Sequence, residues 1–184
     1  MNKRSLSDIQ ADLKAGNLSV VDLVEYYVKQ IEDSKQLNIY IEVYDSEARQ
    51  QAEIIDEKIK SNKTLGKLFG AVISIKDVIC YKDHKLTAAS KILENFESKF
   101  TATALQRLLD EDAIVIGRTN CDEFAMGSSN ENSVYGPTRN GIDPDRVAGG
   151  SSGAAAVSVQ QDTCLLYTSP SPRDQRGSRM PSSA

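Results

Sequence analysis

The stretch Gly70-Ala71-Val72-Ile73-Ser74-Ile75-Lys76-Asp77 decides the fold class. Its β-branched, largely apolar run over 71–75 is short, which is typical of a buried strand. A second run of this kind covers 113–116 and ends at Gly117. Helical patterns separate the strands, and this alternation of helix and strand favours an α/β fold with some parallel strand pairing.

The clearest helical pattern follows Ser19, which forms a capping-box-like helix start with Asp22. Its apolar residues recur at the spacing of a helix with one buried stripe: Val20, Leu23, Val24, Tyr27, Val28 and Ile31. Further helices are expected over 5–15, 45–60, 101–109 and 151–161, and a half-exposed strand over 38–44. The stretch 126–150 is rich in Gly, Ser, Asn and Pro and predicts an irregular loop.

Composition narrows the classes of function. The chain has 184 residues, a net charge of −4 and 40% hydrophobic residues, which predicts a soluble globular protein. No apolar run approaches the roughly 20 residues of a membrane span, so we expect no membrane partner. The acidic balance argues against a surface that grips nucleic acid. The three cysteines form no CxxC pair and only one histidine is present, which predicts reduced thiols in the cytoplasm and no metal site.

The end of the chain differs in composition from the rest. Residues 168–184 hold three of the five prolines and no Leu, Ile, Val or aromatic residue. Such a segment buries too little apolar surface to offset its ordering entropy. We therefore expect one domain over 1–165 and a disordered tail over 166–184. The tail is either a natural flexible segment or, as we favour, non-native, because LLYTSPSPRD resembles translated adaptor or vector sequence.

Lys76 is the first candidate for chemistry, because it ends a buried strand. Burying an ammonium group without a partner is costly. One interpretation is that Lys76 reaches solvent or pairs with Asp77 or another carboxylate. The other is that desolvation favours the neutral amine, which then acts as a base.

Two polar segments are further candidates. Gly149-Gly150-Ser151-Ser152-Gly153 supplies hydroxyls and a helix start suited to an oxyanion, although a flexible turn or a phosphate-binding loop is an alternative. It matches neither the Walker loop nor the GxGxxG pattern. The side chains of 120–133 can line a polar pocket or form a surface loop. Cys121 within it has no histidine near it in sequence, which favours a structural role.

These segments, in this order and spacing, resemble the amidase signature family. The resemblance rests on IKD at 75–77, DEFAMGSSNENSVYGP at 122–137 and GGSSGAAAV at 149–157. The second motif is similar to the A subunits of glutamyl-tRNA(Gln)/aspartyl-tRNA(Asn) amidotransferases. The resemblance covers about 5–164. It implies the N-terminal part of the amidase signature fold, a mixed sheet flanked by helices, in truncated form.

The resemblance also implies a Ser-cisSer-Lys triad. Lys76 matches the catalytic base, and Ser151 matches the bridging serine, whose peptide bond to Gly150 is expected to be cis. A neutral lysine then accepts a proton through Ser151 from a nucleophilic serine, which attacks the side-chain amide of glutamine. Ser128 is the best local candidate for a substrate contact.

The sequence departs from the family at the nucleophile. The nucleophile belongs to a DTGGS-type motif, and its expected position, 24 residues after Ser151, holds Gln175. No DTGGS motif occurs in the chain. The family's substrate-clamping Arg and Asp lie further towards the C-terminus and are missing too. We therefore expect this chain to be inactive by itself.

The function implied by the resemblance is that of a glutaminase subunit, which releases ammonia from glutamine. Its expected partners are the B and C subunits and, through the complex, Glu-tRNA(Gln) or Asp-tRNA(Asn). No cofactor is expected in this subunit, whereas the complex uses ATP and Mg²⁺. Two alternatives stay open: a stand-alone amidase acting on small amides, and a non-catalytic α/β module that binds an anion at its Gly/Ser loop.

Overall fold

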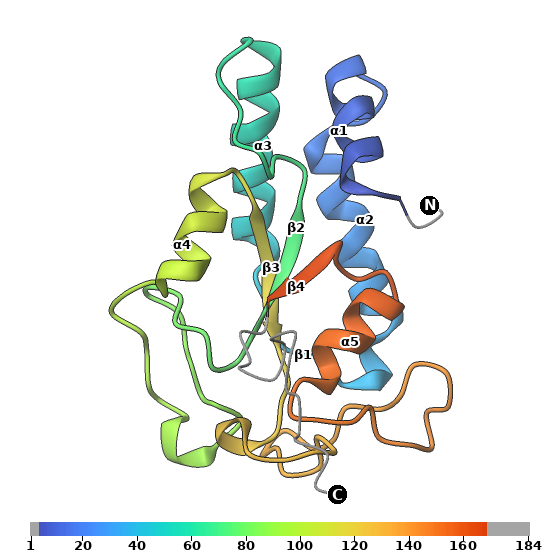
Figure 1. Cartoon of the computed structure of the whole chain (residues 1–184), viewed down its shortest axis with the longest axis vertical. Helices are drawn as coiled ribbons and strands as arrows, with labels where there is room; N and C mark the ends of the chain where they lie inside the picture. The colour runs from blue at the N-terminus through green and yellow to red at the C-terminus, as the bar shows by residue number, and fades with distance from the viewer. Residues whose placement is uncertain (1–3, 169–184) are drawn as a thin grey trace, which may run out of the picture.

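The computed structural model describes residues 4–168, which form a four-stranded sheet with helices on both faces (Figure 1). The helices are α1 (Leu6–Ala15), α2 (Val20–Asp33), α3 (Asp45–Lys60), α4 (Thr103–Asp110) and α5 (Gly153–Gln160). The strands are β1 (Tyr40–Val43), β2 (Val72–Lys76), β3 (Ile114–Thr119) and β4 (Leu166–Thr168). The 3₁₀ turns within this range are η1 (Lys35–Leu37), η2 (Lys91–Leu93) and η3 (Glu123–Ala125). The predicted α/β class is confirmed.

The strands lie in the order β1-β3-β2-β4. β2 pairs in parallel with both β3 and β4, whereas β1 is antiparallel to β3, so the sheet is mixed. The prediction that Gly117 ends the second buried strand is wrong, because β3 continues to Thr119. A Cβ atom at position 117 would lie 2.6 Å from the Glu42 carbonyl oxygen. The glycine therefore lets β1 approach β3 closely.

The helix starts follow the capping chemistry of the sequence. At α2, the Ser19 hydroxyl accepts the N–H of Asp22, and the Asp22 carboxylate accepts the N–H of Ser19. Ser5 and Asp8 form the same capping box at α1. α1 ends at Gly16, whose φ of 72° lies in the left-handed region that glycine adopts at low cost. These caps satisfy backbone groups that a helix end leaves unpaired.

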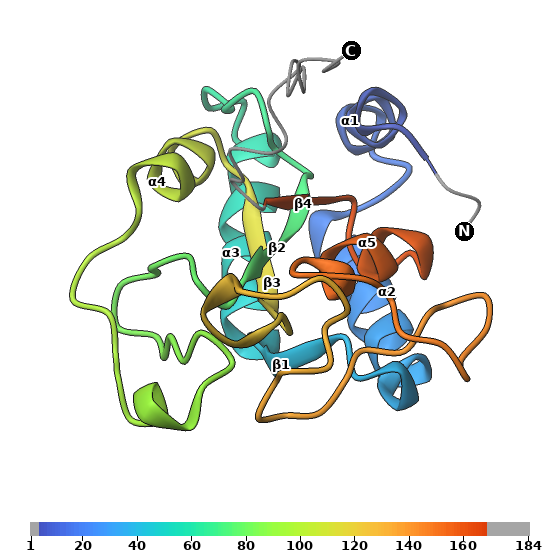
Figure 2. The ribbon, with the colours of Figure 1, turned by 60° about the horizontal axis from the view of Figure 1, so that its bottom comes forward.

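Alternate side chains of β2 and β3 point to opposite faces of the sheet. One face packs against α1, α2 and α3 and contributes Val72, Ile114 and Ile116 to the larger core cluster. The other face packs near α4 and contributes Ile73, Ile75 and Val115 to a second cluster, together with Leu105 of α4. α4 and α5 lie on opposite sides of the sheet (Figure 2). Each fully buried aliphatic side chain contributes about 1.5–3 kcal/mol.

The carboxyl ends of the parallel strands β2 and β3 lie side by side, because Lys76 pairs with Thr119. The Asp77 N–H donates to the Thr119 carbonyl at 3.2 Å and continues this contact beyond the strands. The segment that follows β3 and the Gly/Ser segment before α5 also lie at this end of the sheet. They contact each other there, because the Asp122 N–H donates to the Ser151 carbonyl. The candidate site residues therefore lie together at the carboxyl ends of β2 and β3.

The boundary expected at residue 165 falls inside the described chain. Residues 166–168 form β4, which pairs with β2, although they belong to the segment expected as a tail. The remainder, 169–184, lies outside the described residues, so the predicted disordered, non-native tail stays a prediction. Within residues 4–168, no helix combines the length and the hydrophobicity that a membrane span requires.

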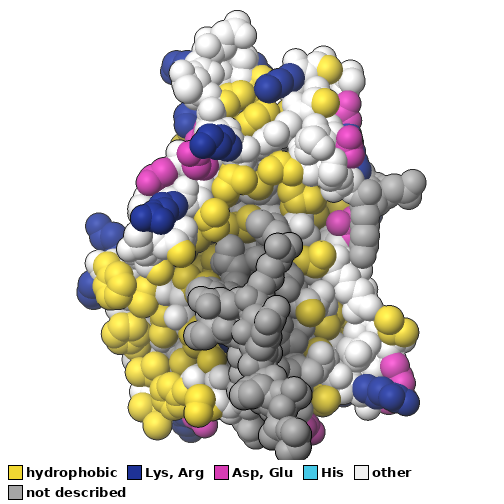
Figure 3. Space-filling model, in the orientation of Figure 1, with side chains coloured by type: hydrophobic (Ala, Val, Ile, Leu, Met, Phe, Trp, Pro, Cys, Tyr) yellow, Lys and Arg dark blue, Asp and Glu magenta, His cyan; other side chains and the backbone are white. Residues whose placement is uncertain are grey.

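Several large apolar side chains lie on the surface. Figure 3 shows them gathered at the lower left, over the segment that contains η2. Ile92 is 80% exposed, Phe96 43% and Phe100 60%. A separate apolar pocket of about 340 Å³ lies between α1, α4 and the sheet. Its lining residues include Leu6, Leu68, Ala71, Ile73, Leu108 and Leu165.

Candidate active site

Lys76 ends β2 and reaches the Gly/Ser segment. Its Nζ atom lies 2.8 Å from Ser151 Oγ and 2.8 Å from Ser152 Oγ. Lys76 is only 5% exposed, so the structure excludes the interpretation in which its amine extends into solvent. The two residues predicted for the proton relay, Lys76 and Ser151, are therefore in contact although 75 positions separate them.

The Gly/Ser segment turns sharply before α5. The peptide bond between Gly150 and Ser151 is cis, as the family resemblance implies. Gly149 has a φ of 86°, a backbone conformation that few residues other than glycine adopt. α5 then begins at Gly153, where a Cβ atom would lie 2.9 Å from the Ala148 side chain. The small residues thus allow Ser151 to face the end of β2 while α5 packs closely behind it.

Asp77 forms its ion pair with Arg118 rather than with Lys76, its neighbour in sequence. It is fully buried and pairs with the Arg118 guanidinium, which also contacts Glu42 at 2.9 Å. Desolvation opposes the charge of Arg118, but attraction to Asp77 and other nearby groups outweighs it and raises the pKa of the guanidinium. The interpretation that Asp77 neutralises Lys76 is therefore not supported, because the carboxylate of Asp77 serves Arg118.

The Asp77 carboxylate also fixes the turn over 87–89 against the end of β2. Its oxygens accept the N–H groups of Thr87 at 2.9 Å and Ala89 at 2.8 Å. Ala88 and Ala89 both have positive φ, 49° and 51°. The Ala88 carbonyl in turn accepts the N–H of Phe124 at 2.8 Å. Asp77 thereby connects the end of β2 to the loop that follows β3.

Ser128 borders the site through its backbone. Its carbonyl oxygen lies 4.0 Å from the point that a Cβ atom on Gly149 would occupy. The residue itself is exposed. Among the hydrogen bonds of the described residues, none joins the Ser128 hydroxyl to Lys76 or Ser151. Its suggested contact with substrate stays a prediction.

Cys121 lies inside the same region but carries no nucleophilic character. It is fully buried, and burial raises the pKa of its thiol to about 12. The thiol is therefore protonated near neutral pH, whereas the thiolate is the reactive form. The structural role predicted for Cys121 agrees with this.

The sequence left open whether the side chains of 120–133 line a polar pocket or form a surface loop, and the structure buries several of them around the site. Asn120 accepts hydrogen bonds from the Cys121 N–H and the Ser133 hydroxyl, and it donates to the Gly136 carbonyl. Asn130 is fully buried, and within the described residues neither polar atom of its side chain has a hydrogen-bond partner. For Asn120 the available signal was its position directly after β3, where parallel strands bring loops together, whereas no local signal marks Asn130.

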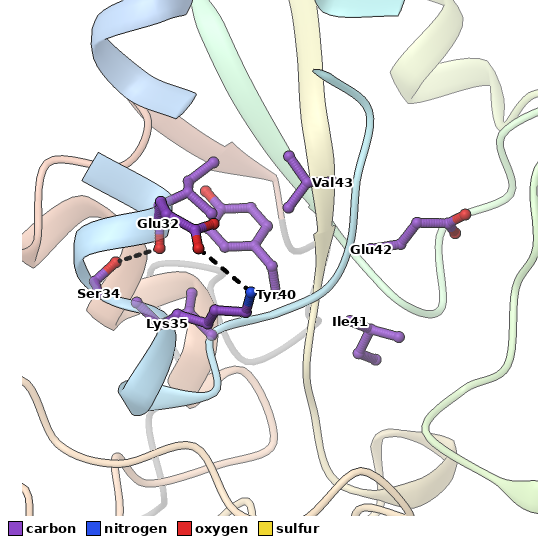
Figure 4. A pocket seen from close by; sticks show the side chains of 9 residues that line it. Glu32, Ser34, Lys35, Tyr40, Ile41, Glu42 and Val43 are labelled. Carbon is purple, nitrogen blue, oxygen red and sulfur yellow. Dashed lines mark hydrogen bonds and ion pairs between the residues drawn. The ribbon is translucent and has the colours of Figure 1, made fainter. Parts of the chain in front are cut away.

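A pocket at the end of α2 lies apart from these residues. It has a volume of about 230 Å³ and opens beside β1 (Figure 4). The Lys35 ammonium and the Glu32 carboxylate form an ion pair of 3.4 Å at its rim, and both side chains are more than two-thirds exposed. Such exposed pairs contribute little to stability or to chemistry. Neither Lys76 nor Ser151 lines this pocket.

A buried lysine bonded to the serine of a cis Gly-Ser bond, at the end of a mixed sheet, is the arrangement expected of an amidase. The sequence profile of the Amidase family matches residues 22–166. The chain therefore belongs to the amidase signature family.

The curated relatives agree with one another. The A subunit of glutamyl-tRNA(Gln) amidotransferase from Chlorobium chlorochromatii is 46% identical over 166 residues, which are 90% of this chain and 35% of the relative. The corresponding protein from Chlorobaculum parvum is 43% identical and is covered to 34%. The chain thus spans about a third of the length of the curated relatives it matches.

Solved structures share the fold. Peptide amidase from Stenotrophomonas maltophilia matches with a TM-score of 0.83 and 27% identity, over 90% of this chain and 36% of that one. The A subunit of glutamyl-tRNA(Gln) amidotransferase from Thermotoga maritima matches with a TM-score of 0.64 and 29% identity, over 85% and 34%. The described residues therefore form part of the amidase signature fold, as the sequence predicts.

Proposed function

We propose that this chain is the N-terminal part of the glutaminase subunit of a tRNA-dependent amidotransferase. The distance of 2.8 Å between Lys76 Nζ and Ser151 Oγ carries the proposal, because a proton relay needs that contact. The identity of 46% to the A subunit of such an enzyme supports the choice of glutamine as substrate.

In the proposed reaction, the neutral Lys76 amine accepts the Ser151 hydroxyl proton while Ser151 takes a proton from the nucleophilic serine. The nucleophile attacks the carbonyl carbon of the glutamine side-chain amide. The C–N bond then breaks, the nitrogen takes the proton back through Ser151, and ammonia leaves an acyl-enzyme. Water hydrolyses the acyl-enzyme to glutamate and restores the serine.

The nucleophile itself is not part of this chain. No DTGGS motif occurs, and the expected position holds Gln175, outside the described residues. The relay of the family activates the serine of that motif, which this sequence lacks. We therefore propose that the chain alone releases no ammonia from glutamine, which a coupled ammonia assay at micromolar protein tests directly.

The wider setting follows from the same proposal. The ammonia would pass to a B subunit, with a small C subunit in the complex, for amidation of Glu-tRNA(Gln) or Asp-tRNA(Asn) in the cytoplasm. ATP and Mg²⁺ would act elsewhere in the complex, and this chain's residues would need no cofactor.

A stand-alone amidase is the second candidate, and a specific observation favours it. The TM-score to peptide amidase, 0.83, exceeds the 0.64 to the amidotransferase protein. Glutamine-dependent amidation of a mischarged tRNA in the presence of B and C subunits would favour the first candidate. Hydrolysis of small amides that is independent of those subunits would favour the second.

The decisive experiment replaces the matching N-terminal segment of a relative's full-length protein with residues 1–165 of this chain. The hybrid then combines the relative's nucleophile with Lys76 and Ser151 of this chain. Lys76→Ala in the hybrid should lower the rate of glutamine hydrolysis by about 10²–10⁴-fold, since it removes the base. Lys91→Ala, at an exposed position, is the matched control and should keep the full rate. A Lys76→Ala rate within tenfold of the parent hybrid would refute the assigned base.

A further inference from the structure

Asp122 carries a buried carboxylate that the proposed reaction does not use. It is fully buried, and its oxygens accept the N–H groups of Asn130 at 3.0 Å and Asn132 at 3.4 Å. Two glycines from different segments press against it. A Cβ atom on Gly127 would lie 2.3 Å from the Asp122 carboxyl carbon, and one on Gly150 would lie 2.0 Å from an Asp122 carboxyl oxygen.

The backbone of Asp122 contacts the same neighbours. Its N–H donates to the Ser151 carbonyl at 3.3 Å, and its carbonyl accepts the N–H of Ala125 at 2.9 Å. Asp122 thus touches both residues of the cis Gly150–Ser151 bond, one through its side chain and one through its backbone. The loop over 127–132 closes around the other side of the carboxylate.

We propose that Asp122 is a positioning residue for Ser151. Its carboxylate fixes the 127–132 loop and the Gly/Ser segment against each other and thereby holds Ser151 Oγ against Lys76 Nζ. This inference rests on the proposed function, because the contact it protects is the proton relay. The carboxylate suits the task because it offers acceptors only and faces two backbone donors.

Substitution of Asp122 should therefore act on Lys76 at a distance. Asp122→Asn keeps the size of the side chain but replaces one acceptor by an NH₂ donor, which cannot bond to a backbone N–H. Asp122→Ala removes both acceptors and leaves space beside Gly150. In both variants the backbone hydrogen bond from Asp122 to Ser151 can persist, but the carboxylate no longer links the 127–132 loop to the packing against Gly150. We therefore expect Ser151 Oγ to shift relative to Lys76 Nζ.

The experiment uses the full chain labelled with ¹³C and ¹⁵N at lysine, and it reads the Lys76 side-chain resonances by NMR. Lys76→Met assigns them. Ser151→Ala gives the shift that follows from losing the contact. Asp122→Asn and Asp122→Ala should move the Lys76 resonances in the same direction by at least half that shift. Glu123→Gln, an exposed neighbouring acid, is the matched control and should leave them unchanged.

A second variant keeps the test valid if the Asp122 variants do not fold. Gly127→Ala leaves Asp122 in place but drives a methyl group into its carboxylate, so it should also shift the Lys76 resonances. In an Asp122→Ala background that folds, the same change should add nothing, because its steric target is gone.

The outcomes separate the inference from the proposed function. If Ser151→Ala shifts the Lys76 resonances but folded Asp122 variants or Gly127→Ala do not, the positioning role of Asp122 is wrong and the proposed relay stands. If Ser151→Ala itself leaves the Lys76 resonances unchanged, the relay contact is absent in solution and both proposals fall.

Discussion

The helical layer, formed by α2 and α3, and the loops at the carboxyl ends of β2 and β3 differ in the kind of side chain that they bury. In α2 and α3 the buried residues are apolar and recur at helical spacing: Val20, Leu23, Val24, Tyr27, Ile31, Ala48, Ala52 and Ile55. At the carboxyl ends of β2 and β3 many buried residues are polar, among them Asp77, Thr87, Ser90, Arg118, Asn120, Asp122 and Asn130. Apolar contact shapes the first region, and side-chain hydrogen bonds to backbone shape the second.

This difference predicts how each region responds to change. Apolar packing is spread over many weak contacts of about 0.1–0.2 kcal/mol each, so the loss of one such contact costs little. A buried polar group left without its partner costs the full desolvation penalty. The loops should therefore be less tolerant of single polar substitutions than the helices, with the exception of the residues that serve chemistry.

The largest effect is expected from Asp77→Ala. The change leaves the Arg118 guanidinium, whose side chain is 3% exposed, without its buried partner. Removing one member of a buried ion pair costs about 3–5 kcal/mol. That is a large share of the roughly 5–15 kcal/mol that stabilises a typical domain. Urea denaturation followed by circular dichroism measures the free energy of unfolding.

The matched control for Asp77→Ala is Glu42→Gln. Glu42 contacts the same guanidinium, but its side chain is 42% exposed, so the loss should be no more than about 1 kcal/mol. Equal losses from the two variants would mean that burial does not distinguish the partners of Arg118.

A smaller effect is expected in the helical layer from Ser19→Ala. The change removes the hydroxyl that accepts the Asp22 N–H at 3.0 Å and should lower the free energy of unfolding by about 1 kcal/mol. Thr64→Ala, at an exposed position between α3 and β2, is the control and should change little. A fall in the free energy of unfolding of more than about 3 kcal/mol would mean that Ser19 does more than cap the helix.

The smallest effect is expected from Lys76→Met, although Lys76 is as buried as the core. Methionine is unbranched and only one atom shorter than lysine, and it removes the cost of holding an amine away from water. We expect the free energy of unfolding to stay within about 1 kcal/mol of the parent or to rise, as is common at residues kept for chemistry. Urea denaturation measures it, and a fall of more than about 2 kcal/mol would indicate that Lys76 is mainly structural.

The same division explains what the sequence could predict. Apolar spacing and capping motifs predicted α1, α2 and α3 closely, because the interactions that form them are local in sequence. The partners in the loops lie far apart, as Asp77 and Arg118 do at a separation of 41 residues, and no local pattern joins them. The Lys76–Ser151 contact was predicted only through the family resemblance. For Asp122 and Asn130, within 120–133, the sequence left a polar pocket and a surface loop both open, because burial of a polar loop depends on partners distant in sequence.

The two alanines after Thr87 carry a further consequence for the substitutions that this turn accepts. Ala88 and Ala89 are 4% and 1% exposed, and buried positions of this kind ordinarily accept a larger aliphatic residue. Their positive φ angles reverse that preference, because branching at Cβ clashes with the backbone in the left-handed region. A library randomised at both positions should return glycine, asparagine and alanine and exclude valine and isoleucine. Backbone geometry, rather than the hydrophobicity of the surroundings, determines which amino acids positions 88 and 89 accept.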